Sequence, residues 1–217
     1  MRKDVFANGE IYHAYNRGVE KRPTFLCADD YLRFLESMRI FNTIKTGGRI
    51  GALYEAKPCE DEQLVRIVAY CLMPNHFHLV LKQVADDGIS RFIQKLATGY
   101  TMYFNKCYDR SGVLFQGVFK SKHVPTNEYL LHLSRYVHLN PLDLIPTGSS
   151  PEEKRRFLRE YRWSSFGEYL SVGDGLADGK AIVLNQFRSP KEYVKFVYDL
   201  VGEDRDDFAR FRLDKRG

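Results

Sequence analysis

The stretch LVRIVAYCLMPNHFHLVLKQ, residues 64–83, decides the fold and raises the first question about function. Two runs of strand-forming residues flank the short link MPNH, and this pattern predicts the two arms of a β-hairpin. Side chains alternate along a strand, so His76 and His78 project from one face, opposite to Phe77, Leu79 and Leu81. We expect the apolar face to supply the core and the histidine face to stay exposed.

The rest of the chain surrounds this hairpin with alternating strand and helix patterns. Hydrophobic spacing predicts strands at residues 11–18 and 113–124, and helices at residues 29–44, 89–107 and 126–140. The order β-α-β-β-α-β-α predicts an α+β protein with a ferredoxin-like βαββαβ core, in which helices cover one face of an antiparallel sheet and the other face remains free.

Beyond Pro141 the composition changes, and this change suggests a boundary. We expect a first domain over residues 1–145, followed by a helical C-terminal extension over residues 146–217 that packs on or beside it. We expect a helix in the extension near residues 189–201. Residues 45–63, rich in Gly and Pro, predict an irregular loop.

Composition and charge narrow the function classes. Lys and Arg total 33 against 28 Asp and Glu, which gives a net charge of +5 and favours a polyanionic partner without requiring one. The four cysteines form no CxxC pair, so neither a zinc knuckle nor a redox motif is indicated. No long apolar segment predicts export or a membrane span, so we expect a cytoplasmic protein.

Two neutral imidazoles side by side on a strand can share one divalent metal ion, but two ligands do not complete a site. The third helix offers a stripe of candidates at helical spacing: His132, Tyr136 and Asn140. Simpler explanations stay open, because HxH also occurs on solvated strands and the stripe also suits a half-buried Tyr followed by an Asn C-cap.

Several blocks, in order, resemble the HUH single-tyrosine transposases, and most closely the REP-associated tyrosine transposases. They span roughly residues 10–170 and read YHAYNRGVEKRPTF, AYCLMPNHFHLVL, YTMYFNKCYDRSGVLFQGVFKSKHV, YLLHLSRYVHLNP and YRWSSFGEY. The resemblance implies that His76 and His78 bind a divalent metal ion, Mg or Mn, and that Tyr136 is the nucleophile. Family members often place a glutamine where this chain has Asn140, one methylene shorter, so direct ligation and a water bridge both stay open. His132 and His138 are alternative helpers.

The resemblance also implies an activity. Residues 1–145 would be the catalytic domain of a metal-dependent single-stranded DNA endonuclease and strand transferase that cuts at hairpin DNA, typically a repeated palindrome, through a 5′-phosphotyrosine. It would work in the cytoplasm at the nucleoid, as a monomer or a homodimer. Two alternatives stay open: a domesticated hairpin-binding protein with little or no transposition activity, and a metal hydrolase that uses a water nucleophile. Tyr100 and Tyr129 are rival nucleophiles by residue type.

Cationic side chains together with aromatic rings favour the binding of single-stranded DNA. Two segments combine them, YNRGVEKR and FQGVFKSKHV, and a further arginine precedes Tyr136. The DNA-binding candidates are Arg17, Lys21, Arg22, Lys120, Lys122, His123 and Arg135. Ordinary solvated charges around an edge strand are the alternative explanation.

Overall fold

A computed structural model describes residues 5–45, 62–171, 173 and 175–201. The predicted loop at residues 45–63 therefore lies almost entirely outside the described residues. The four-stranded sheet has the order β2-β3-β1-β4, and each neighbouring pair is antiparallel. Its strands are β1 (Ile11–Arg17), β2 (Val65–Met73), β3 (His76–Gln83) and β4 (Lys120–His123).

Two helices complete the ferredoxin-like βαββαβ core, as predicted. Helix α1 (Ala28–Phe41) follows β1, and helix α3 (Gly88–Cys107) joins β3 to β4. The two helices pack against each other and cover the sheet face that carries Phe77, whose ring centroid is 5.3 Å from that of Phe34 on α1. Phe34 and Phe77 are buried, so this face is the apolar core that the alternation predicts.

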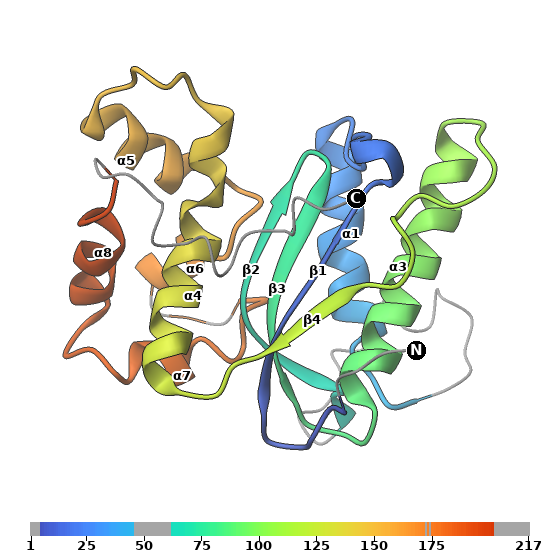
Figure 1. Cartoon of the computed structure of the whole chain (residues 1–217), viewed down its shortest axis with the longest axis horizontal. Helices are drawn as coiled ribbons and strands as arrows, with labels where there is room; N and C mark the ends of the chain where they lie inside the picture. The colour runs from blue at the N-terminus through green and yellow to red at the C-terminus, as the bar shows by residue number, and fades with distance from the viewer. Residues whose placement is uncertain (1–4, 46–61, 172, 174, 202–217) are drawn as a thin grey trace.

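The expectation that the second face stays free is wrong. Helix α4 (Asn127–Leu139) lies on that side of the sheet, with α1 and α3 on the other (Figure 1). Its side chains Leu130, Leu133 and Val137 are fully buried. An amphipathic helix must bury its apolar side against another surface, and here it uses the histidine side of β2 and β3.

The predicted strand at residues 113–124 is too long, because only Lys120–His123 pairs as a strand. The preceding segment crosses the end of β1 as an irregular chain. The Gln116 amide donates to the Arg17 carbonyl, and the Val19 amide donates to the Leu114 carbonyl. Gly117 has a φ of 61°, a backbone conformation that interrupts a strand.

The C-terminal part of the described chain is helical and lies beside α4 (Figure 1). It contains α5 (Pro151–Glu160), α6 (Phe166–Leu170), α7 (Ala181–Leu184) and α8 (Pro190–Tyr198), so the helix expected near residues 189–201 is confirmed. Buried hydrogen bonds attach it to α4: Nδ1 of His138 lies 2.6 Å from the Tyr193 hydroxyl, and Nε2 lies 2.8 Å from the Ser165 hydroxyl. None of the described helices is long and apolar enough to cross a membrane.

Candidate active site on the histidine face

One face of the sheet gathers the candidate site residues that the alternation separates from the core. His13, Tyr15 and Arg17 from β1 share this face with His76 and His78 from β3, and we call it the histidine face. The ring centroids of His76 and His78 are 5.1 Å apart. The side chain of Tyr136 on α4 contacts the same face, with its ring centroid 5.4 Å from that of His78. The sheet and α4 therefore bring the predicted histidine pair and the predicted nucleophile together.

The hairpin turn fixes the orientation of His76. Pro74 and Asn75 form the two-residue turn between β2 and β3, and the Asn75 amide nitrogen donates to the Lys21 carbonyl. That bond leaves the Asn75 oxygen facing Nδ1 of His76, at 2.7 Å. An amide oxygen only accepts hydrogen bonds, so Nδ1 of His76 carries the proton and Nε2 presents its lone pair. The lone pair of Nε2 is what a metal ion requires.

His78 is held in a different way, by another histidine. Its Nδ1 lies 2.8 Å from Nε2 of His13, and both side chains are fully buried. The residues are diagonal neighbours on the antiparallel strands β1 and β3, so long side chains can meet across them. The remaining nitrogen of His78, Nε2, is buried without a hydrogen-bond partner among the described residues.

Burial keeps the imidazoles of this face neutral. Desolvation, with a smaller contribution from Lys122, lowers the pKa of His13 to about 3. Desolvation and the positive charge of Arg17 lower the pKa of His76 to about 3. Desolvation, followed by the neighbouring histidines and Arg17, holds the pKa of His78 well below its usual value. The expectation of an exposed histidine face is therefore wrong, and its imidazoles are in the neutral form that binds metals.

Cations border the same face. Arg17 pairs directly with His76 across β1 and β3, while Lys122 and Lys120 on β4 pair with His13 and Tyr15 across β1. Directly paired residues project to the same side of a sheet, so all three cations belong to the histidine face. A phosphate near Tyr136 would therefore meet positive charge supplied by two strands.

The residues fit a divalent ion, although the histidines alone do not complete its coordination. Within the described residues, no group of three or more His, Cys, Asp or Glu side chains is arranged to hold a metal. The unpartnered Nε2 of His78 and the oriented Nε2 of His76 are two suitable donors. Asn140 is buried at the end of α4, and its amide nitrogen donates to the Tyr136 carbonyl. That bond does not use the amide oxygen, which is the atom a metal would bind.

Other predicted site residues lie elsewhere. Arg135 is buried, with its guanidinium 4.0 Å from the ring centroid of Phe196 on α8 and a hydrogen bond to the Phe196 carbonyl. It also contacts Nδ1 of His132, which draws both residues toward α8 and away from the histidine face. His123 pairs with Tyr12 on β1, whose side chain is on the opposite face, and its Nε2 lies 2.6 Å from a carboxylate oxygen of Glu10. Arg135 and His123 therefore do not belong to the histidine face.

The remaining candidates for DNA binding and catalysis also lie in different parts of the fold. Lys21 is exposed, and its carbonyl accepts a hydrogen bond from the side chain of Asn75, so Lys21 lies beside the hairpin turn that precedes His76. Arg22 forms an ion pair with Glu20. Tyr100 is buried in the core and donates to the Thr24 carbonyl, which excludes it as a nucleophile in this fold. His138 is committed to Tyr193 and Ser165.

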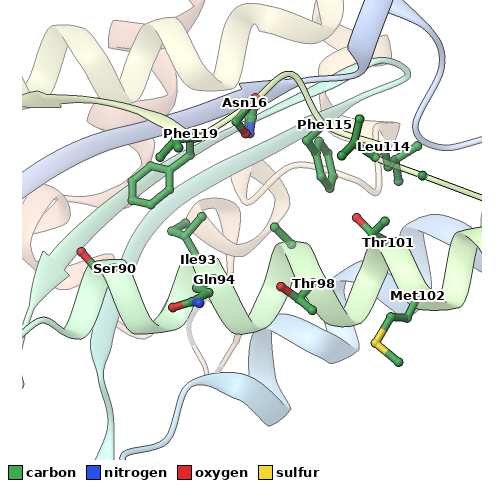
Figure 2. A pocket seen from close by; sticks show the side chains of 15 residues that line it. Asn16, Ser90, Ile93, Gln94, Thr98, Thr101, Met102, Leu114, Phe115 and Phe119 are labelled. Carbon is green, nitrogen blue, oxygen red and sulfur yellow. The ribbon is translucent and has the colours of Figure 1, made fainter. Parts of the chain in front are cut away.

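A cavity of about 600 Å³ lies between α3 and residues 112–119 (Figure 2). Asn16 lines it from β1, on the face opposite to Arg17 and the histidines. Its lining includes Ser90, Gln94, Thr98 and Phe115, and none of the described residues that line it is charged or a histidine. This cavity therefore lacks the groups that phosphate or metal chemistry requires.

Comparison with known proteins shows a family likeness over part of the chain. Residues 53–140 match the model of the family described as "Transposase IS200 like", and the match includes His76, His78 and Tyr136. The resemblance to the IS200-like transposases is confirmed. No curated protein matches the sequence.

A solved structure of a REP-associated tyrosine transposase bound to a REP hairpin is similar in fold to this chain. The TM-score is 0.54 at 14% identity, and the alignment covers 80% of this chain and 92% of that chain. Identity this low carries a likeness of fold only. It supports the ferredoxin-like architecture.

Sequence reasoning missed His13. The alternation in IYHAYNR places His13, Tyr15 and Arg17 on one face of β1, and this signal was present in the sequence. What the sequence does not reveal is the pairing of β1 with β3, which sets His13 beside His78. His13 lies outside the residues that match the family.

Proposed function

We propose that this protein is a metal-dependent single-stranded DNA endonuclease and strand transferase that cuts at hairpin DNA and forms a 5′-phosphotyrosine on Tyr136. The observation that carries the proposal is the placement of the Tyr136 ring 5.4 Å from the ring of His78, above an oriented histidine pair. The match to IS200-like transposases over residues 53–140 supports the same conclusion.

Nε2 of His76 and Nε2 of His78 would hold a divalent ion, Mg or Mn, with Asn140 as third ligand either directly or through water. Such an ion supplies charge neutralisation at a non-bridging phosphate oxygen. Arg17, Lys120 and Lys122 would hold the backbone phosphates of the strand, since they share the histidine face. Lys21, beside the hairpin turn, and Arg22 are proposed as further contacts.

Tyr136 performs the covalent step. Its phenolic oxygen attacks phosphorus, and as the new O–P bond forms, the bond from phosphorus to the 3′ oxygen breaks. The phenol gives up its proton, and the departing 3′ oxygen gains one to become a hydroxyl. The phosphodiester energy is kept in the tyrosine ester, so attack by another 3′ hydroxyl reverses the step and joins two strands without a nucleotide cofactor.

The two parts of the chain have different roles in this proposal. We propose that residues 1–145 are the catalytic domain and that the helical extension, residues 146–217, braces α4. The contacts of Arg135 with Phe196 and of His138 with Tyr193 support that bracing role. An enzyme acting on chromosomal hairpins would work in the cytoplasm at the nucleoid.

The test is a denaturing gel of purified protein incubated with hairpin oligonucleotides from the flanks of its gene, with Mg or Mn. We expect a covalent protein–DNA band for the wild type and for Tyr129→Phe, a matched change on the same helix. The band should fall at least about 1,000-fold in Tyr136→Phe and disappear in His76→Ala/His78→Ala and with EDTA.

Two outcomes would replace the proposal. Hairpin binding without any covalent band would indicate a DNA-binding protein that no longer cuts. Cleavage that survives Tyr136→Phe but stops in His76→Ala/His78→Ala would indicate a hydrolase with a water nucleophile.

A further inference from the structure

The contact between His13 and His78 sets a condition on both rings. Two neutral imidazoles that share one hydrogen bond need one donor and one acceptor. Since Nε2 of His13 and Nδ1 of His78 are the atoms in contact, only two proton arrangements are possible. Either Nδ1 of His78 donates to His13, or Nε2 of His13 donates to His78.

The two arrangements differ in whether Nε2 of His78 carries a proton. If His78 donates from Nδ1, its Nε2 carries a lone pair and can bind a cation. If His13 donates instead, the proton of neutral His78 moves to Nε2, and that buried nitrogen cannot be a ligand. The direction of one hydrogen bond thus decides whether His78 can bind a metal ion.

His76 shows what an orienting partner does on this face. The oxygen of Asn75 is 2.7 Å from Nδ1 of His76 and can only accept, which leaves Nε2 as the ligand atom. His13 occupies the corresponding position at Nδ1 of His78, at 2.8 Å. Each histidine of the pair therefore has its own neighbour at Nδ1, one from the turn and one from β1.

We infer that His13 is a positioning residue that accepts a hydrogen bond from Nδ1 of His78 and so holds His78 in its metal-binding tautomer and orientation. This role rests on the proposed function, because it concerns the same metal site. Outer partners of metal-bound histidines generally act in this way, and their loss lowers metal affinity by about 10- to 100-fold. His13 itself has no contact with substrate in this account.

The experiment compares two substitutions of similar size in the full-length protein. His13→Gln retains an acceptor near the position of Nε2, while His13→Leu fills similar space without one. The affinity for Mn²⁺ is measured by calorimetry in the absence of DNA, and thermal melting checks the fold of each variant. We expect His13→Leu to bind Mn²⁺ about 10-fold or more weakly than wild type, and His13→Gln to stay within about threefold.

A second measurement keeps the inference testable even if His13→Leu does not fold. Nitrogen NMR of the histidine-labelled wild type, without metal, distinguishes protonated from unprotonated ring nitrogens. We expect Nδ1 of His78 to carry the proton. A proton on Nε2 of His78, or equal Mn²⁺ affinity in wild type and folded His13→Leu, would overturn the role of His13.

The double variant His76→Ala/His78→Ala separates this inference from the proposed function. If it binds Mn²⁺ as tightly as wild type, the metal site itself is wrong, and the role of His13 falls with it. If it loses Mn²⁺ while folded His13→Leu retains wild-type affinity, the metal site stands and only the positioning role is overturned.

Discussion

The two faces of the sheet are built from alternate residues of the same strands and have different roles. One face packs the hydrophobic core, and the other carries the candidate site. On one face, Phe77 packs against Phe34 and Phe115 with ring centroids 5.3 Å and 5.6 Å away, and the packing is that of an ordinary core. On the other, the Tyr136 ring of α4 lies against His13 and His78 and both histidines are buried, yet one nitrogen of each has no hydrogen-bond partner among the described residues.

The difference teaches where stability and function are separated in this fold. Buried polar atoms without partners cost free energy, so a face that keeps them is not optimised for stability alone. Phe77 and His78 are adjacent residues of β3, yet Phe77 packs in the core and His78 lies in the candidate metal site. Changes at adjacent residues should therefore have unlike consequences.

Phe77→Ala should produce the largest loss of stability. Removing a fully packed ring leaves a cavity between the sheet and α1, at a cost of about 3–5 kcal/mol in the free energy of unfolding. Urea denaturation measures this cost. The Mn²⁺ affinity of the folded fraction should not change, and a large loss of affinity would contradict the separation of the two faces.

His78→Ala should lower the affinity for Mn²⁺ more than it lowers stability. Losing one of two histidine ligands should weaken Mn²⁺ binding by at least about 100-fold, more than the loss of an outer partner. Calorimetry with Mn²⁺ measures the affinity, and Phe77→Ala is the matched control from the neighbouring position. Unchanged affinity in His78→Ala would remove this residue from the metal site.

The sequence predicts this separation but not the burial of its functional side. Alternation in HFHLVL is enough to set the histidines opposite Phe77, and helical spacing is enough to place Tyr136 and Asn140 on one stripe. Neither pattern tells which surface α4 covers. Burial lowers the pKa of His76 and His78 and keeps their imidazoles neutral, and this burial depends on tertiary packing that local periodicity does not encode.

Arg135→Gln tests whether this residue contacts DNA or braces α4 against α8. Arg135 was predicted to contact DNA from its type and its position before Tyr136, but its guanidinium stacks on Phe196. We expect a loss of about 1–2 kcal/mol in unfolding free energy, from the lost stacking and hydrogen bonds. The salt dependence of DNA binding should not change, and a shallower slope would restore Arg135 as a phosphate contact.

Lys122→Ala should have the smallest effect, confined to DNA. Lys122 faces His13 across β1 and β4, so it should neutralise one phosphate of the bound strand. We expect weaker binding of single-stranded DNA and a decrease of about 0.7 in the slope of log affinity against log salt. The matched control is Lys106→Ala, the same charge change at an exposed position on α3. Equal slopes for both variants would contradict a DNA role for the histidine face.

The most direct measurement of the central claim is mass spectrometry of the covalent adduct after nuclease trimming and trypsin digestion. Trypsin cuts after Lys122 and Arg135, so Tyr129 and Tyr136 fall in separate peptides, residues 123–135 and 136–154. The account predicts a nucleotide joined through its 5′ phosphate to Tyr136. A nucleotide on any other residue, or cleaved DNA without a modified peptide, would contradict it.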